Sequence, residues 1–294
     1  MTIPVFAPYI QTYASRTPYL TTAEYVNAPT GVDVSQLVPG GSEQENLDAL
    51  ATTIARASNA ADIYCHQVLS ATLDTVTGKY RVRGDGTIRV PVPYTPIVSV
   101  NSLQAGFTPT SLQPVTDLSG VWWSRKVLEI PTRNVGFQSA NAGFPNRGTS
   151  GLLYVVLTYV NGFANTLTSA PVNAGATTIT IESPLGIFPG LPLNIYDPGS
   201  TELVTVAALN GNTITVAEPL QFAHDAAVAI SALPPAIKQA VTLLTSALIK
   251  TRGVGAVIMP TLGGQPQKEA PIEDGGSEDM AMAEALLLEF VRIT

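Results

Sequence analysis

The chain has 294 residues, a formal net charge of −7 at pH 7, one cysteine and two histidines. These counts exclude a disulfide framework and a multi-cysteine metal cluster, and they leave few residues for histidine-based catalysis. Only 13% of the residues are charged, against roughly 25% in ordinary soluble proteins. Since 45% are hydrophobic, the chain can bury a core. The composition favours a structural or assembly protein.

The N-terminal segment, residues 1–41, is rich in Pro, Thr, Tyr and Gly and has no sustained period. We predict an extended arm there, with a frayed terminus as the alternative. Its tyrosines favour an arm that packs on something: Tyr9, Tyr13, Tyr19 and Tyr25. No basic region precedes an apolar run, as a signal peptide requires, and the longest strongly apolar run, 152–160, is shorter than a membrane-spanning helix. We therefore expect no targeting segment and no membrane partner.

A helix is predicted next, over residues 42–70. Ser42 and Glu45 have the spacing of a capping box, in which each side chain bonds the other residue's backbone N–H. Apolar residues then recur at spacings of three and four and form one stripe. The stripe consists of Leu47, Leu50, Ile54, Ala57, Ala61, Tyr64 and Val68.

Alternation with a period of two begins at Thr75 and indicates strands. Residues 79–83 and 87–92 are predicted to form a hairpin around Gly84-Asp85-Gly86. Further strands are predicted at 97–103, 121–130 and 152–160.

Eight of the 15 basic residues lie between positions 79 and 147. Among them, Arg81, Arg83 and Arg89 are candidates for contacts with an acidic partner or a nucleic-acid backbone. Ordinary solvated strand charge is the simpler explanation of the same residues.

Residues 167–231 form five short alternating segments separated by Pro-Gly and Asn-Gly turns. The predicted strands are 177–181, 193–196, 202–206, 213–216 and 227–230. No Lys or Arg occurs from Gly148 to Ile237. The segment is long enough for a small β-barrel or sandwich of its own. Because helices flank the sheet and this module, we interpret it as an insertion into one α+β domain made of 42–166 and 232–253.

Helical periodicity resumes after Pro234 and Pro235, which suit a helix start, and ends near Gly253. Residues 254–294 are interpreted as a Gly/Pro-rich linker followed by a short C-terminal helix that Ser277 caps. Met282, Leu286 and Phe290 mark the predicted apolar face of this helix.

The search for chemistry gives no catalytic constellation. Cys65 and His66 are neighbours about 100° apart on the predicted helix, so they do not face each other as nucleophile and base. We expect a buried thiol beside a solvated imidazole. His224 lies next to Asp225, but no nucleophile motif accompanies the pair, and a loop histidine is expected. We predict no enzyme activity, no cofactor and no metal site.

Several short segments occur in a recognisable order. The first helix closes with Ala60-Ala-Asp-Ile-Tyr-Cys-His-Gln-Val-Leu69, and Pro91-Val-Pro-Tyr-Thr-Pro-Ile-Val-Ser-Val100 follows the hairpin. Leu233-Pro-Pro-Ala-Ile-Lys-Gln-Ala240 and Ile249-Lys-Thr-Arg-Gly253 belong to a second helix. This order resembles the head-to-tail adaptor (head-completion or connector) proteins of tailed bacteriophages. The resemblance covers about 42–130 and 232–253 and leaves both ends poorly matched.

The resemblance implies a structural virion protein at the head–tail junction, made in the host cytoplasm and acting in genome packaging and ejection. Such adaptors form a ring, expected to have twelve copies, that docks on the portal and continues the DNA channel. The implied partners are further copies of the chain, the portal protein, stopper or tail proteins, and double-stranded DNA that passes without sequence-specific binding. The linker and final helix would grip the portal through Met282, Leu286 and Phe290. Alternatively, this helix packs on the hydrophobic core of its own chain.

Two other functions remain open. One is a different head–tail component: a stopper, a tail terminator or a minor capsid protein. The other is a carbohydrate- or cell-binding β module that uses Trp122 and Trp123 as an aromatic platform. Exposure of both rings would support this last function. Because consecutive strand residues face opposite sides, we expect at least one of the two rings in the core.

Overall fold

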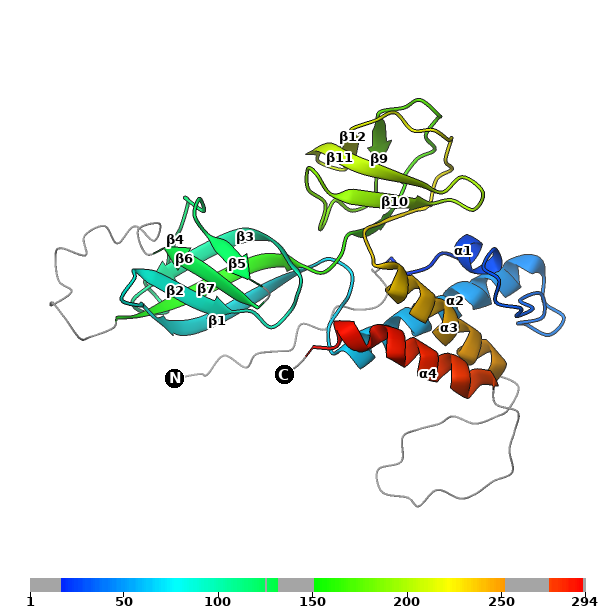
Figure 1. The fold of residues 1–294 in the computed structure, drawn as a ribbon, viewed down its shortest axis with the longest axis horizontal. Coiled ribbons are helices and arrows are strands. Elements are labelled where there is room, and N and C mark those ends of the chain that lie inside the picture. The colour runs from blue at the N-terminus through cyan, green and yellow to red at the C-terminus, as the bar shows by residue number, and fades with distance from the viewer. Residues whose placement is uncertain (1–16, 125, 132–150, 252–274, 293–294) are drawn as a thin grey trace, which may run out of the picture. The chain divides into compact units, whose positions relative to one another are not determined.

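The computed structural model describes residues 17–124, 126–131, 151–251 and 275–292 (Figure 1). It contains both helices and antiparallel sheets, which confirms the mixed α+β class. The chain divides into two compact units. The helix–barrel unit comprises Met1–Gln67, Asn165–Ser183 and Pro189–Thr294, and the sandwich unit comprises Val68–Ala164 and Pro184–Phe188.

This division differs from the predicted one, in which 42–166 and 232–253 form one core. The strands of 68–164 enclose a hydrophobic core of their own. The β module predicted at 167–231 groups with the helices rather than standing apart from them. Periodicity shows which residues face inward, but it does not show which element they face.

The helices of the helix–barrel unit pack on one another. They are α1 (Thr22–Val26), α2 (Glu43–Cys65), α3 (Pro235–Thr251) and α4 (Gly275–Leu287), followed by the 3-10 helix η5 (Leu288–Phe290). Helix α3 contacts both α2 and α4 (Figure 1). On α2, the predicted stripe is buried at Leu50, Ile54, Ala57 and Ala61.

Both ends of α2 have a local cause. The capping box is confirmed, because Glu45 N donates to Ser42 Oγ (3.3 Å) and Ser42 N donates to Glu45 Oε2 (2.7 Å). The helix ends at Cys65, five residues before its predicted end, because His66 adopts a left-handed conformation with φ 53°. Further along, Leu69 and Ser70 pair with Phe163 in the sandwich unit instead of continuing the helix.

The described part of the N-terminal arm packs against the helices. Tyr19 and Tyr25 are both buried, in agreement with an arm that packs. The arm is not extended throughout, because residues Thr22–Val26 form α1 behind a capping box of Thr21 and Glu24. Residues 1–16, which include the other two tyrosines, lie outside the described part of the chain.

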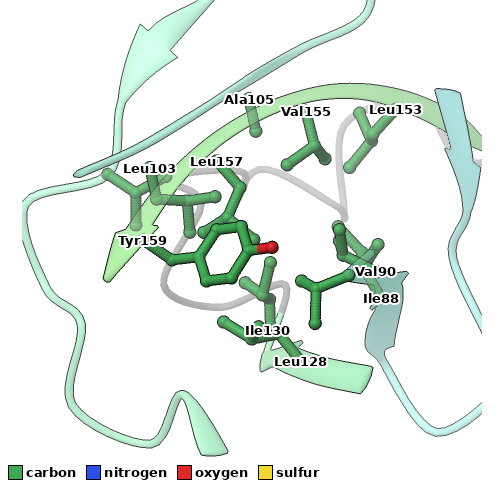
Figure 2. Packing of buried hydrophobic residues seen from close by; sticks show 12 residues of the cluster. Ile88, Val90, Leu103, Ala105, Leu128, Ile130, Leu153, Val155, Leu157 and Tyr159 are labelled. Atoms are coloured by element: carbon green, nitrogen blue, oxygen red, sulfur yellow. The ribbon is translucent and has the colours of Figure 1, made fainter. Parts of the chain in front are cut away.

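The sandwich unit consists of two antiparallel sheets. One has the order β1 (Thr72–Arg81), β7 (Leu152–Asn161), β3 (Ile97–Gly106) and β4 (Gln113–Pro114). The other has the order β2 (Thr87–Pro91), β6 (Val127–Pro131) and β5 (Trp122–Ser124). Figure 2 shows Ile88, Val90, Leu128 and Ile130 of the smaller sheet lying against Val155, Leu157 and Tyr159 of the larger one.

The predicted hairpin between residues 79 and 92 forms only next to its turn, where Val82 and Ile88 make a single antiparallel bridge and Arg83 N donates to Thr87 O (2.8 Å). The turn at 84–86 forms, since Gly86 N donates to Arg83 O (3.0 Å), but β1 pairs with β7 and β2 pairs with β6. The chain changes sheets at this turn, which lets β2 place Ile88 and Val90 in the core. The single strand predicted at 121–130 is likewise a hairpin, in which β5 pairs with β6.

The β module of the helix–barrel unit is a six-stranded sheet. Its order is β8 (Asn165–Leu167), β13 (Ala229–Ser231), β10 (Pro192–Tyr196), β11 (Glu202–Asn210), β12 (Thr213–Val216) and β9 (Thr178–Thr180). All five predicted strands are present. The two outer strands of this order meet, because Ser169 N donates to Thr180 O (2.9 Å) and Glu182 N donates to Leu167 O (3.0 Å). These bonds close the sheet into a small barrel.

Candidate functional site

A groove of about 430 Å³ lies in the helix–barrel unit between α1, α3 and β10. It is lined among others by Glu24, Tyr196 and Lys238. Lys238 Nζ lies 2.5 Å from Glu24 Oε1 and 3.7 Å from the centroid of the Tyr196 ring. The side chains of Lys238 and Glu24 are only 8% and 9% exposed, so the groove is built over a buried ion pair.

Three different elements place these side chains. Glu24 belongs to the α1 capping box, where its Oε2 accepts the Thr21 N–H (2.7 Å) and its Oε1 is left for Lys238. Lys238 lies in the first turn of α3, and Tyr196 ends β10. Burial lowers the pKa of Lys238, and the charge of Glu24 and its hydrogen bond oppose this effect. Burial, with a smaller contribution from Glu24, raises the pKa of Tyr196.

Sequence analysis missed this cluster, because Glu24 and Lys238 are 214 positions apart. One signal existed: Lys238 is the first basic residue after a long stretch without Lys or Arg.

Further hydrogen bonds near this ion pair connect the N-terminal segment to the helices and to the barrel. Tyr25 and Ser246 share a hydrogen bond (2.9 Å), Tyr19 donates to Asp62 (2.5 Å), and Asn165 Nδ2 donates to the carbonyl of Thr17 (3.1 Å). The segment that begins at residue 17 therefore links the barrel to the helices.

A second buried cluster surrounds His224 in the barrel. His224 Nδ1 lies 3.0 Å from Asp197 Oδ2, and its Nε2 lies 2.7 Å from Glu202 Oε1. His224 lies in the loop before β13, as predicted for a loop histidine. Its ring is nevertheless fully buried, and its acidic partners are Asp197 and Glu202 rather than the adjacent Asp225. Which of the two ring nitrogens donates depends on the tautomer of the imidazole.

Glu202 also holds the loop that carries His224. Its carboxylate accepts the N–H groups of Gln221 (2.9 Å) and Phe222 (3.4 Å). Burial alone would raise the pKa of Glu202, but these amides and the His224 ring lower it by more. The cluster fastens the loop before β13 to β11 and to the end of β10.

Cys65 and His66 have the expected environments, with the thiol buried and the imidazole exposed. Burial, with a smaller contribution from Asp62, raises the pKa of Cys65 to about 12. We therefore expect a thiol reagent at pH 8 to label the native chain at least about a hundredfold more slowly than the urea-unfolded chain, since the thiolate is the reactive form. The chain has one cysteine, so the labelling rate reports on Cys65 alone. Equal labelling rates would contradict the buried position.

The three predicted portal anchors lie on α4 and η5 and differ in exposure. Met282 is 59% exposed, whereas Leu286 and Phe290 are half-buried. The buried hydrophobic side chains among the described positions of α4 are Ala283 and Leu287, so the packed face lies one residue further along the chain than predicted. The end of this segment is tied to α2, because Gln67 Nε2 donates to Phe290 O (2.9 Å) and Arg292 N donates to Cys65 O (2.9 Å).

The three predicted basic residues are all exposed, but they are not brought together on one sheet. Arg81 ends β1 in the larger sheet, and Arg83 follows it at the turn. Arg89 lies on β2 of the smaller sheet, where its Nε is 2.5 Å from Glu129 Oε1. The charge of Arg89 is therefore compensated, and Arg81 and Arg83 remain candidates for an acidic partner.

The expectation that at least one tryptophan lies in the core is wrong. Trp122 is 51% exposed and Trp123 is 40% exposed. Their strand, β5, is three residues long and pairs only with β6. At such an edge even the ring on the inner side of the strand stays accessible.

Within the described part of the chain, no group of three metal-ligating side chains is found and no helix is long and apolar enough to cross a membrane. Comparison with protein-family models, curated proteins and solved structures found no match to this chain. The residues themselves are thus the basis for any assignment of function.

Proposed function

We propose that the chain is a head-to-tail adaptor that forms a ring between the portal and the tail of a bacteriophage particle. The observation that carries the proposal is the packing of α2 against α3, although the whole sandwich unit and barrel separate them in sequence. These are the two helices that carry the resemblance to the adaptor family. The described clusters around Lys238 and His224 join elements to one another, which suits a structural protein.

The charge distribution supports self-association. Residues 68–164 hold eight of the 15 basic and four of the 22 acidic residues, a formal charge of +4. The remaining residues hold 7 basic and 18 acidic ones, a formal charge of −11. Two units of opposite charge favour a head-to-tail contact between copies, the type of interface that closes into rings. The acidic excess of the whole chain also disfavours tight binding of passing DNA.

The portal contact needs revision under this proposal. Because α4 packs on α3 and the residues after it are tied to the end of α2, the final helix is not a free gripping arm. Residues 252–274, which hold the predicted linker, lie outside the described part of the chain. The large exposed apolar side chains described on α4 and η5 are Met280, Met282 and Leu288. We assign the portal contact to the side of α4 that carries Met282, because Met282 is the one predicted anchor that is exposed.

The test is imaging of the particles that contain the chain. We expect averaged electron micrographs, with an antibody fragment bound to the chain, to show a ring of label at the head–tail junction. Label on the capsid shell or on the tail tip would overturn the adaptor proposal. Label on the ends of tails that lack heads would favour the tail-terminator alternative instead.

A saccharide-binding role is the second candidate, and one observation favours it. Both tryptophan rings are exposed, which is the condition set for an aromatic platform. The two roles are compatible, since a virion protein can also carry a glycan-binding surface.

A further inference from the structure

Three side chains form a row across the smaller sheet of the sandwich unit. Arg89 lies opposite Glu129, and Glu129 lies opposite Trp122, in the registers of β2, β6 and β5. Directly opposed residues share one face of a sheet. The chain neighbours of Arg89 and Glu129 point into the core (Figure 2), so the row lies on the outer face. Those neighbours are Ile88, Val90, Leu128 and Ile130.

The row presents one aromatic ring beside one ion pair. Trp122 is 51% exposed. The Arg89 side chain is 52% exposed and the Glu129 side chain 10% exposed, with 2.5 Å between Arg89 Nε and Glu129 Oε1. Because all three residues stand on paired strands, their spacing is fixed by the sheet.

These groups select the chemical class of a ligand. The guanidinium offers N–H donors and the carboxylate offers acceptor oxygens, which together match adjacent hydroxyl groups that both accept and donate. The indole is a flat apolar surface that can cover the C–H face of a pyranose ring, and sites of this kind combine aromatic walls with few polar groups. Since the two charges cancel, the row has no net charge to attract a phosphate or sulfate.

The next outward positions of the three strands carry both polar and apolar side chains. Ser124 lies opposite Val127, which lies opposite Pro91, and Thr87 lies opposite Pro131. The indole therefore has apolar neighbours for the carbon face of a ring and hydroxyl groups for its edge. We propose that Trp122, Arg89 and Glu129 form a binding site for a neutral saccharide, independently of whether the chain is an adaptor.

The two tryptophans allow a direct test, because they are the only ones in the chain and both lie on β5. Tryptophan fluorescence, excited selectively over tyrosine, thus reports from this strand alone. The full chain and its Trp123→Phe variant, which keeps Trp122 as sole reporter, would be titrated with maltohexaose, cellohexaose and chitohexaose. We expect a saturable change in emission with at least one of these neutral hexasaccharides in both proteins.

Matched variants then locate the site, with binding measured by calorimetry. Trp122→Ala should weaken the association about tenfold or more, whereas Trp123→Ala, its neighbour on the opposite side of the strand, should stay within about twofold. Glu129→Gln keeps the shape of the side chain and should also weaken binding about fivefold or more, through loss of the ionised acceptor. This second variant keeps the test valid if Trp122→Ala does not fold.

Three results would overturn the proposal. The first is no response to any of the three neutral hexasaccharides. The second is equal loss in Trp122→Ala and Trp123→Ala, which would point to the edge of β5 rather than to its outer face. The third is tighter binding of a heparin hexasaccharide or of oligo(dT), which would indicate an anion site. Since imaging of particles tests the adaptor ring separately, failure of one proposal leaves the other standing.

Discussion

Replacing Glu24 with alanine is expected to destabilise the helix–barrel unit by about 3–5 kcal/mol. The substitution leaves the Lys238 ammonium buried beside Tyr196 without its counter-charge. It also removes the carboxylate that accepts the Thr21 N–H at the start of α1. The loss should release α1 from α3 and β10, because this ion pair joins all three elements at the groove.

The two units can be followed separately in one urea titration. All described helices belong to the helix–barrel unit, so circular dichroism at 222 nm reports mainly on it. Both tryptophans belong to the sandwich unit, so tryptophan fluorescence, excited selectively over tyrosine, reports on that unit. Glu24→Ala should lower the midpoint seen by circular dichroism and leave the fluorescence midpoint unchanged. Equal shifts in both signals would argue against a local role for this pair.

Two controls separate charge from packing. Lys250 and Asp279 form an ion pair of similar length (2.7 Å), but the lysine side chain is 39% exposed. Lys250→Met should therefore cost less than about 1 kcal/mol. The double variant Glu24→Leu with Lys238→Met should recover most of the loss, because replacing both members of a buried pair by apolar residues is often neutral. If Glu24→Ala costs no more than Lys250→Met, the pair is not structurally important.

The sequence predicted single helices and strands well, but it did not predict which strands pair with each other. The capping box at Ser42 and the alternating strands of the barrel depend on neighbours in sequence, and both are present. The hairpin at 84–86 also had the right turn residues, yet its two strands belong to different sheets. Local turn chemistry fixes a reversal of the chain, but the burial of Ile88 and Val90 decides which sheet the next strand joins.

The candidate sites likewise combine features that depend on neighbouring residues, which the sequence predicts, with contacts between distant elements, which it does not. The exposure of Arg81 and the burial of Cys65 follow from local pattern, and both were predicted. The partners of Lys238 and His224 come from distant strands and from α1, so no spacing in the chain indicates them. The outward row of Arg89, Glu129 and Trp122 exists only through strand register, which the predicted single strand at 121–130 could not supply.

Replacing His224 with alanine is expected to destabilise the barrel by about 3 kcal/mol. The variant leaves the carboxylates of Asp197 and Glu202 near each other without the ring that separates and bonds them. Hydrogen exchange is the suitable measurement, because the His224 N–H and the Val172 N–H bond each other's carbonyls (2.8 Å) at this site. Exchange should accelerate in residues 168–173 and 219–226 and stay unchanged in α2.

Acid should act on the same cluster through Glu202. Because the folded state lowers the pKa of this carboxyl, its contribution to stability is present above the pKa of the unfolded chain, about 4.3. That contribution is lost as the pH falls through the lower folded pKa. Protection of residues 219–226 should therefore decrease below about pH 4 in the parent chain.

Glu202→Gln should weaken protection at pH 7 and flatten this acid dependence. Glu218→Gln, which alters an exposed carboxyl of the same barrel, should change neither the protection at pH 7 nor its acid dependence. An acid dependence that persists in Glu202→Gln would assign the loss to other carboxyl groups.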